Sequence, residues 1–403
     1  MKCDLAMVAP YPGRGSDDGT QSGVAAYTER LAGSLADHGL AVRVLAPEMP
    51  GEPRTRRAGQ VMVERCYQRG AGALTTAAAV AARTKAPVAH LQFETFLYGG
   101  PTSVPAMAPA LAALRTRQRG PVVTMHQVVD PVTVDRAFTR VHRVRVPAAA
   151  ARLGLSCIQR TVGALSAATV VHEPAFAEIL RDATVVPIGL ERAVVTEDDR
   201  RAARRSLGLP DDRLVALCFG YLAPYKGLEA ALEAARLCGG AVELVVAGGS
   251  HPRFAGRDDY GENLRTRYAR TARFTGYVSD ADIAAWFQAA DVLLLPYPKP
   301  FASSGPFALA MGYGTPPLCS PGLARCLGAP DELVTPIDPP ELAAHLCRLA
   351  VDQGRLRTLR AVTRAMAAGR SWDEVARRHI AIYEEVIHAR RPARRSLRTR
   401  KPR

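Results

Sequence analysis

The sequence has no uninterrupted apolar run of about 18 residues, so no segment is expected to span a bilayer. Its N-terminus, MKCDLAMVAPYPG, is too short and too strand-like for a secretory signal peptide. The eight cysteines form no CxxC pair and show no metal-ligand spacing, which argues against a zinc module. We expect them to be reduced, as in a cytosolic protein, and to pack as small apolar side chains. These absences together predict a cytoplasmic protein without a bound metal.

At 403 residues, 48% of them hydrophobic, the chain is long enough for two domains that each bury a core. Its formal net charge of +15 is uneven, because Ala389–Arg403 holds eight lysines or arginines and no acid, leaving +7 for the rest. We interpret this tail as disordered, and either simply solvated or in loose contact with an anionic membrane surface through Arg390–Arg403. It has no aromatic residue to stack on bases, so no nucleic-acid partner is expected.

The most informative stretch runs from Asp291 to Ser320. Its apolar run Val292–Leu295, closed by a proline, is typical of a parallel strand buried on both faces. The following turn is rich in small residues, and its helix is expected to start at a proline and end at a glycine; the residues are Ser303, Ser304, Gly305, Pro306 and Gly314. Such a strand, turn and helix N-terminus favours a phosphate or diphosphate, because free N–H groups and the helix dipole converge there. An ordinary capped helix gives the same pattern.

The beginning of the chain predicts the first crossover of a doubly wound sheet. A strand at Leu5–Ala9 leads into a glycine-rich loop, then a helix starting near Gly23 and a second strand at Ala41–Ala46. The loop lacks the GxGxxG spacing of dinucleotide-binding folds, so a crossover without a ligand stays open as the alternative.

Two further strands are expected at Val88–Phe93 and Pro121–Met125, and polar residues follow each of them. Glu94 comes after the first strand and His126 after the second. Open α/β sheets bind ligands at the carboxyl ends of their strands, so both side chains are candidate site residues. A purely structural histidine is the alternative for His126.

A second domain is expected after a charged linker at Glu191–Arg205. It opens with a strand at Leu214–Phe219, and Lys226 then precedes a helix, where it is well placed to neutralise a phosphate as a point charge. No lysine lies between Gly227 and Lys299, which argues against a pyridoxal-type phosphorylase with a Schiff-base lysine in this domain. A last helix at Trp372–His388 follows the second domain and could fold back across the first.

Taken in order, these motifs resemble the retaining glycosyltransferase family 4, from Met1 to about Ile387. The residues that carry the resemblance are SGVAAY (Ser22–Tyr27), VVTMH (Val122–His126), VVPIG (Val185–Gly189), GYLAPYKG (Gly220–Gly227), RFTGYVSD (Arg273–Asp280), DVLLLPY (Asp291–Tyr297), GTP (Gly314–Pro316) and SW (Ser371, Trp372). The resemblance implies the GT-B fold: α/β, with two doubly wound Rossmann-like domains facing a cleft and a C-terminal helix crossing back. The expected parts are an acceptor-side domain over 1–190, a nucleotide-sugar-binding domain over 191–370, a crossover helix over 371–388 and the tail over 389–403.

The implied activity is transfer of a sugar from a nucleoside-diphosphate sugar to the hydroxyl of a saccharide, lipid-linked or small-molecule acceptor. Retention of anomeric configuration is implied, and no metal or other cofactor is expected. The residues fall into three expected roles: catalytic (His126, Lys226, Glu94), diphosphate-binding (Gly23, Lys226, Ser303, Ser304, Gly305) and nucleobase- or ribose-binding (Gly220, Tyr221, Gly276, Tyr277).

The chain departs from the family's pattern at two places. Phe301 and Leu309 stand where most members carry the glutamates of a Glu-x7-Glu motif, and Tyr221 replaces a usual arginine. The chain is similar to a branch that has SSG before this helix and a segment like HLQFETFLYGG (His90–Gly100) in the first domain. Two alternative hypotheses stay open. One is a catalytically lapsed sugar-nucleotide-binding or scaffold subunit, and the other is a GT-B coupling enzyme that acts on a non-standard acceptor.

Overall fold

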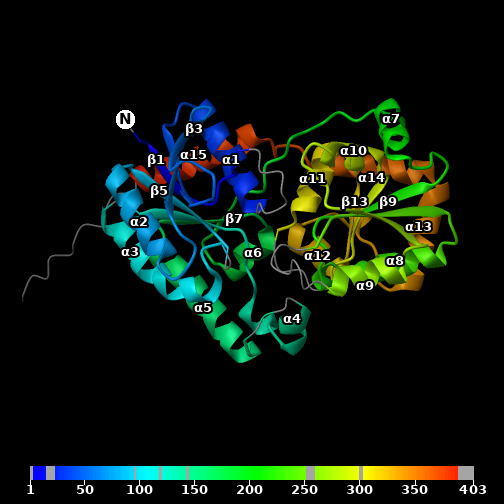
Figure 1. Ribbon diagram of the computed structural model, residues 1–403, viewed down its shortest axis with the longest axis horizontal. Helices are drawn as coiled ribbons and strands as arrows, with labels where there is room; N and C mark the ends of the chain where they lie inside the picture. Colours follow the sequence, from blue (N-terminus) through cyan, green and yellow to red (C-terminus); the bar gives the residue numbers. More distant parts are fainter. Residues whose placement is uncertain are drawn as a thin grey trace, which may run out of the picture.

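The computed structural model describes residues 3–14, 23–94, 97–117, 120–141, 144, 146–250, 259–298 and 303–388. These residues form two α/β domains side by side, each with a central sheet between helices (Figure 1). Expectations that concern Ser22, Phe301 and the basic tail lie outside the described residues. Within the described part, no helix has the length and apolar character needed to cross a bilayer.

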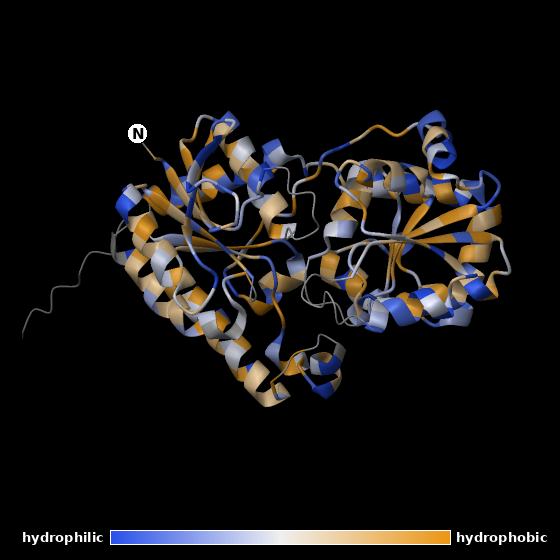
Figure 2. Ribbon diagram, viewed as in Figure 1, coloured by the Kyte–Doolittle hydropathy of each residue, from blue (hydrophilic) through white to orange (hydrophobic). Residues whose placement is uncertain are grey.

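The first sheet has eight strands in the order β3-β4-β2-β1-β5-β6-β7-β8, all parallel to their neighbours except β3. Its strands are β1 (Leu5–Val8), β2 (Val42–Pro47), β3 (Thr55–Ala58), β4 (Val61–Tyr67), β5 (Val88–Phe93), β6 (Pro121–Met125), β7 (Ala168–Val171) and β8 (Thr184–Val185). The central strands of this sheet are apolar and orange in Figure 2, whereas the edge strand β3 is charged and partly exposed. One face packs against α1 (Gly23–Asp37) and the other against α2 (Ala73–Thr84), α3 (Met107–Arg117) and α5 (Ala148–Leu165).

The second sheet has five parallel strands in the order β11-β10-β9-β12-β13. They are β9 (Leu214–Phe219), β10 (Val242–Ala247), β11 (Ala272–Gly276), β12 (Val292–Leu295) and β13 (Pro317–Cys319). Helices α8 (Leu228–Leu237), α9 (Asp259–Arg267), α13 (Pro339–Val351) and α14 (Gln353–Met366) cover one face. Helices α7 (Glu197–Leu207), α10 (Ile283–Ala289), α11 (Gly305–Tyr313) and α12 (Pro321–Leu327) cover the other. The predicted fold class is therefore confirmed.

The prediction of a linker over Glu191–Arg205 is wrong for its second half, which belongs to α7. A capping box at Thr196 starts this helix, and Gly208 in the left-handed conformation ends it. Arg204 is buried and donates to a carboxylate oxygen of Asp291 at 2.6 Å, just before β12. Charged residues of this segment thus bind the helix to the sheet. The high charge of the segment therefore did not mean that it is a solvated linker.

The chain crosses between the domains twice, and the two crossings lie side by side. The N–H of Leu190 donates to the carbonyl oxygen of Arg370 at 2.7 Å. Immediately afterwards, α15 (Trp372–His388) packs against α1 and against β5 of the first domain (Figure 1). A Cβ on Gly189 would lie 2.4 Å from a ring carbon of Trp372, so only glycine fits at this contact. The last helix thereby fastens the end of the second domain to the first.

Gly189→Ala is predicted to destabilise the protein by about 1–3 kcal/mol, because the added methyl group overpacks the contact with the Trp372 ring. The measurement is the thermal midpoint, followed by the fluorescence of the two tryptophans. The matched control is Gly33→Ala within α1, where an added Cβ meets no atom within 4 Å. This control is expected to gain about 0.5–1 kcal/mol from its better helix propensity. Equal midpoints for Gly189→Ala and the wild type would show that the contact carries no such constraint.

Candidate active site

Strand order reverses at one point in each sheet, between β1 and β5 in the first and between β9 and β12 in the second. Ligands of open α/β sheets bind outside the carboxyl ends of the strands at such points. Residues that follow strands of the two sheets meet across the domain boundary. Glu94, after β5, acts electrostatically on Tyr225, after β9, and Glu173, after β7, interacts with Ser303, after β12. The two ligand-binding edges therefore face each other.

Lys226 is a buried cation at the second of these points. It ends the short 3₁₀ turn Pro224–Lys226, and its Nζ donates to the carbonyl oxygen of Phe219 at 3.0 Å. Burial lowers the pKa of Lys226 to about 8, and only 5% of the residue is exposed. Gly220 has a φ of +95°, and a Cβ there would lie 2.6 Å from Nζ and 3.7 Å from Pro306. Glycine at this position therefore leaves room for the ammonium group beside the start of α11.

The N-terminus of α11 is built as the sequence predicts, with Gly314 ending the helix at a φ of +68°. The Ser304 hydroxyl caps the helix by accepting from the Phe307 N–H at 3.3 Å. The Ser303 hydroxyl oxygen is buried, and the group that it faces across the domain boundary is the Glu173 carboxyl. A hydroxyl beside a helix N-terminus can donate its proton to an anionic oxygen bound there.

His126 lies inside a chain of buried polar side chains after β6. Its Nε2 is 2.7 Å from Oε1 of Gln92, and its Nδ1 is 3.0 Å from Nε2 of His172. The other nitrogen of His172 donates to the carbonyl oxygen of Val186 at 2.9 Å. Burial keeps the pKa of His126 well below its ordinary value, and the neighbouring histidines lower it further. Both ring nitrogens of His126 thus contact protein groups, and its lowered pKa keeps the buried ring neutral.

Glu173 is a site residue that sequence analysis missed. It lies just beyond His172 after the end of β7 and is 5% exposed, and burial raises its pKa to about 8 against the opposing charge of Arg370. The signal was available, because Glu173 is a polar residue at a strand end like Glu94 and His126. Its contact with Ser303 depends on how the two domains face each other, which the sequence does not display.

The remaining predicted residues lie at the ends of β9 and β11 and at the start of α1. Gly276 ends β11 with a φ of +73°, and the adjacent Tyr277 is 46% exposed. Tyr221 follows Gly220 two strands away in the same sheet. Gly23 begins α1, as predicted, but residues 15–22 of the preceding loop lie outside the described part. Their roles toward a nucleotide stay predictions.

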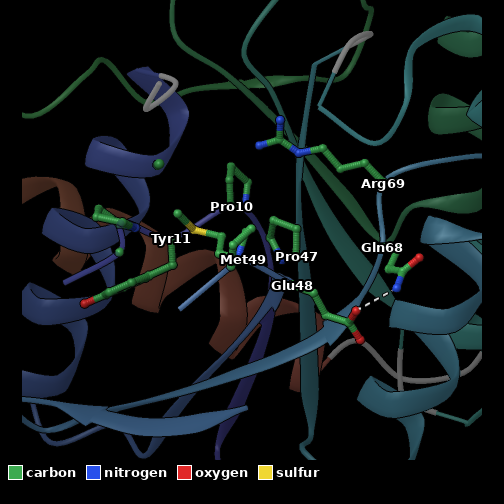
Figure 3. A pocket seen from close by; sticks show the side chains of 11 residues that line it. Pro10, Tyr11, Pro47, Glu48, Met49, Gln68 and Arg69 are labelled. Carbon is green, nitrogen blue, oxygen red and sulfur yellow. Dashed lines mark hydrogen bonds between the residues drawn. The ribbon is translucent and has the colours of Figure 1, made fainter. Parts of the chain in front are cut away.

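A cavity of about 660 Å³ opens in the first domain at the carboxyl ends of β1, β2 and β4 (Figure 3). It is lined by residues 10–13, 47–50 and 68–69, with Ala25 from the first turn of α1. One wall is thus the loop that follows β1 at the first reversal point of strand order. Sequence analysis placed the glycine-rich loop at the ligand edge but did not predict this cavity.

Glu173→Gln is predicted to stabilise the protein above about pH 5, with a gain that grows up to about pH 8 and then stays constant. The folded state keeps the Glu173 proton up to its raised pKa of about 8, whereas the unfolded chain releases it near the ordinary 4.5. Wild-type stability therefore falls between these values as the pH rises, and glutamine removes that loss. Melting temperatures of both proteins across this range make the measurement. Glu178→Gln, on the exposed side of the same helix, is the control, and identical pH profiles for Glu173→Gln and the wild type would contradict the assignment.

Comparison with known proteins points to sugar transfer. Residues 213–352 match the family model described as "Glycosyl transferases group 1". D-inositol 3-phosphate glycosyltransferase of Mycobacterium tuberculosis (strain ATCC 25618 / H37Rv) is 31% identical over 214 residues, which cover 50% of this chain and 44% of the relative. The matched region thus spans less than half the length of this curated relative.

Solved structures share the whole architecture at low identity. A sucrose-phosphate synthase from Thermosynechococcus elongatus aligns with a TM-score of 0.73 at 20% identity, covering 96% of this chain and 99% of the other. HepE of Anabaena, solved in complex with UDP, aligns with a TM-score of 0.68 at 14% identity, covering 95% and 100%. These likenesses show the GT-B fold. Within the second domain, residues 213–352 are similar to the group 1 glycosyltransferases.

Proposed function

We propose that the protein is a retaining, metal-independent glycosyltransferase that moves a sugar from a nucleoside-diphosphate sugar to an acceptor hydroxyl. The observation that carries the proposal is the buried Lys226 ammonium beside the N-terminus of α11, at the reversal point of the second sheet. A desolvated cation and a helix N-terminus aimed at one place suit a diphosphate better than a neutral ligand.

The relatives support a nucleotide-sugar donor. HepE has been solved with UDP-glucose, and the curated relative is named for glycosyl transfer to an inositol phosphate. We extend the donor class, a nucleoside-diphosphate sugar, to this chain. Within it, Gly220, Tyr221, Gly276 and Tyr277 are proposed to contact the nucleobase and ribose, because they line the carboxyl ends of β9 and β11.

Transfer breaks the bond between the anomeric carbon and the diphosphate oxygen, and negative charge develops on the diphosphate. Lys226, the Ser303 hydroxyl and the Gly305 N–H would stabilise that charge, with Ser304 fixing the turn and the Gly23 loop approaching from the facing domain. This charge stabilisation needs no metal. Among the described residues, no group of three or more His, Cys, Asp or Glu is arranged to hold one.

Retention with no covalent intermediate requires the acceptor hydroxyl to attack from the face that the diphosphate leaves. The hydroxyl proton would pass to the departing phosphate oxygen, because His126 has both ring nitrogens engaged with Gln92 and His172. We therefore assign His126 to sugar positioning at the end of β6. Glu94, at the end of β5 and close to the Tyr225 ring, is proposed to bind a hydroxyl of the sugar or the acceptor.

A catalytically lapsed subunit is the alternative, and one observation favours it. Leu309 packs among apolar residues of the second domain and brings no carboxylate to the place that most of the family fill with glutamate. Sugar transfer or nucleotide-sugar hydrolysis by the purified protein would show that it is an active enzyme. The lapsed subunit would show neither activity. Contact of the basic tail with an anionic membrane at the cytoplasmic face stays a separate prediction, since Arg390–Arg403 lie outside the described residues.

Lys226→Ala is predicted to lower turnover at least about tenfold while the fold survives, because the developing charge on the leaving diphosphate loses its cation. The pH dependence is a sharper test. Wild-type affinity for the nucleoside diphosphate should fall as the pH rises through about 8, where free Lys226 loses its proton, and the variant should show no such fall.

The measurement is binding by isothermal titration calorimetry at pH values from about 6.5 to about 9.5. The ligand is whichever of UDP, GDP and ADP raises the melting temperature of the wild type most. Arg213→Ala is the matched control, since Arg213 is a partly exposed cation at the opposite end of β9. Wild-type turnover in Lys226→Ala, or the same pH profile in both proteins, would remove Lys226 from the site.

A further inference from the structure

A continuous chain of buried polar side chains links the crossover helix α15 to His126. The hydroxyl of Tyr383 on α15 lies 2.7 Å from Nδ1 of His90. Nε2 of His90 lies 2.7 Å from the Thr124 hydroxyl and 3.2 Å from the Gln92 amide. The other polar atom of that amide lies 2.7 Å from Nε2 of His126. All five side chains are buried, so the donors and acceptors of the chain have to satisfy one another.

The far end of the chain sets the positions of its protons. The carbonyl oxygen of Val186 can only accept, so Nδ1 of His172, at a distance of 2.9 Å, carries a proton. Burial lowers the pKa of His172 to about 4, so its ring is neutral at neutral pH and its Nε2 carries no proton. Nδ1 of His126, 3.0 Å from that nitrogen, must therefore donate. In a neutral His126 ring, this leaves Nε2 without a proton.

Gln92 satisfies that bare nitrogen in one orientation only. With Oε1 of Gln92 at 2.7 Å, an unprotonated Nε2 of His126 would face a second acceptor. A rotation of the amide group by about 180° exchanges its oxygen and nitrogen without changing the shape of the side chain. The amide then donates to His126, and its oxygen accepts from Nε2 of His90, whose Nδ1 accepts from the Tyr383 hydroxyl. Every link from Tyr383 to Val186 then joins a donor to an acceptor.

The opposite orientation of Gln92 would require a charged His126. With the amide oxygen toward Nε2, both ring nitrogens would have to donate, and the resulting imidazolium would be buried. Burial lowers the pKa of His126, and the neighbouring histidines lower it further, so the neutral ring is favoured.

The surroundings of His126 offer no counter-charge for a second proton. The titratable groups of the elements packed around it are histidines and tyrosines: His90 on β5, His172 after β7, His379 and Tyr383 on α15, and Tyr27 on α1. Glu173, just beyond His172, interacts with Ser303 and Arg370 instead. In the part of the chain that the structure describes, no carboxylate contributes to the pKa of His126.

We propose that Gln92 is a positioning residue for sugar transfer: its amide donates to Nε2 of His126 and thereby holds this ring neutral beside the donor sugar. The inference rests on the proposed function for the place of the sugar. As the bond to the diphosphate breaks, the anomeric carbon and the ring oxygen of the sugar gain positive charge. A neutral imidazole does not oppose that charge, whereas an imidazolium in a site with little water would repel it.

The first test reads the ring protons of the wild-type protein by NMR. Isotopically labelled histidine and proton–nitrogen correlation spectra show which ring nitrogen carries a proton, and variants that each lack one histidine assign the signals. At about pH 7, His126 and His172 should be neutral with the proton on Nδ1, and His90 should be neutral with the proton on Nε2. A proton on Nε2 of His126 would overturn the proposal. This test needs no substrate and no variant of Gln92.

The second test compares Gln92→Glu with the matched control Gln92→Met, which removes the amide without adding an acid. The carboxylate of Gln92→Glu can only accept, so it should raise the pKa of His126 and leave both ring nitrogens protonated at about pH 7. His126 should stay neutral in Gln92→Met. Turnover of Gln92→Glu should then be at least about tenfold below that of Gln92→Met, and the difference should shrink as the pH rises and His126 loses its proton.

A neutral His126 in Gln92→Glu, or equal turnover of the two variants at every pH, would refute the role of Gln92. The wild-type spectra decide the matter even where a variant does not fold. A wild-type protein that transfers sugar while Nε2 of His126 is protonated would refute this inference alone. A wild-type protein that transfers no sugar would refute the proposed function, and the spectra would still report the proton on His126.

Discussion

The pairing of the two interdomain crossings is the constraint on which the rest of the molecule depends. Leu190 and Arg370 are hydrogen-bonded through their backbones, and Gly189 and Trp372 pack against each other just beside them. Both crossings lie together, and α15 then anchors on α1, while α12 of the second domain contacts α6 of the first. That attachment fixes which edges of the two sheets meet. With these contacts in place, Glu94 faces Tyr225 and Glu173 faces Ser303.

The facing edges hold ionisable groups in environments that disfavour their charges. Burial lowers the pKa of Lys226 and raises that of Glu173, so both groups lie in places where water has been excluded. Burying these ionisable groups lowers the stability of the ligand-free protein. Such a loss of stability is expected at a site that binds a ligand. A desolvated ammonium interacts more strongly with a diphosphate than a hydrated one does, because no water shields the pair.

Much of the fold could be predicted because buried parallel strands are unbroken apolar runs. Strands β5, β6, β9 and β12 fall on the predicted residues, and α11 ends at Gly314 as expected. The errors have a common cause: the residues concerned contact partners that lie far away in the sequence. Helix α7 was taken for a linker because its charges find their partners, such as Asp291, only in the folded chain. The β3–β4 hairpin and the Arg65 contacts beneath the first loop were missed for the same reason. Sequence patterns placed residues at strand ends but did not show which ends meet.

The contacts between the domains offer a structural explanation for Leu309, which stands where most of the family carry a glutamate. Two carboxyl groups of the first domain reach loops of the second, with Glu94 at the Tyr225 turn and Glu173 at Ser303. A site whose acids and cation lie on opposite domains is complete only while the two edges are together. Closure would then both assemble the polar groups and exclude water from the donor. Dividing the site between domains therefore couples its assembly to the geometry of the crossings rather than to any single loop.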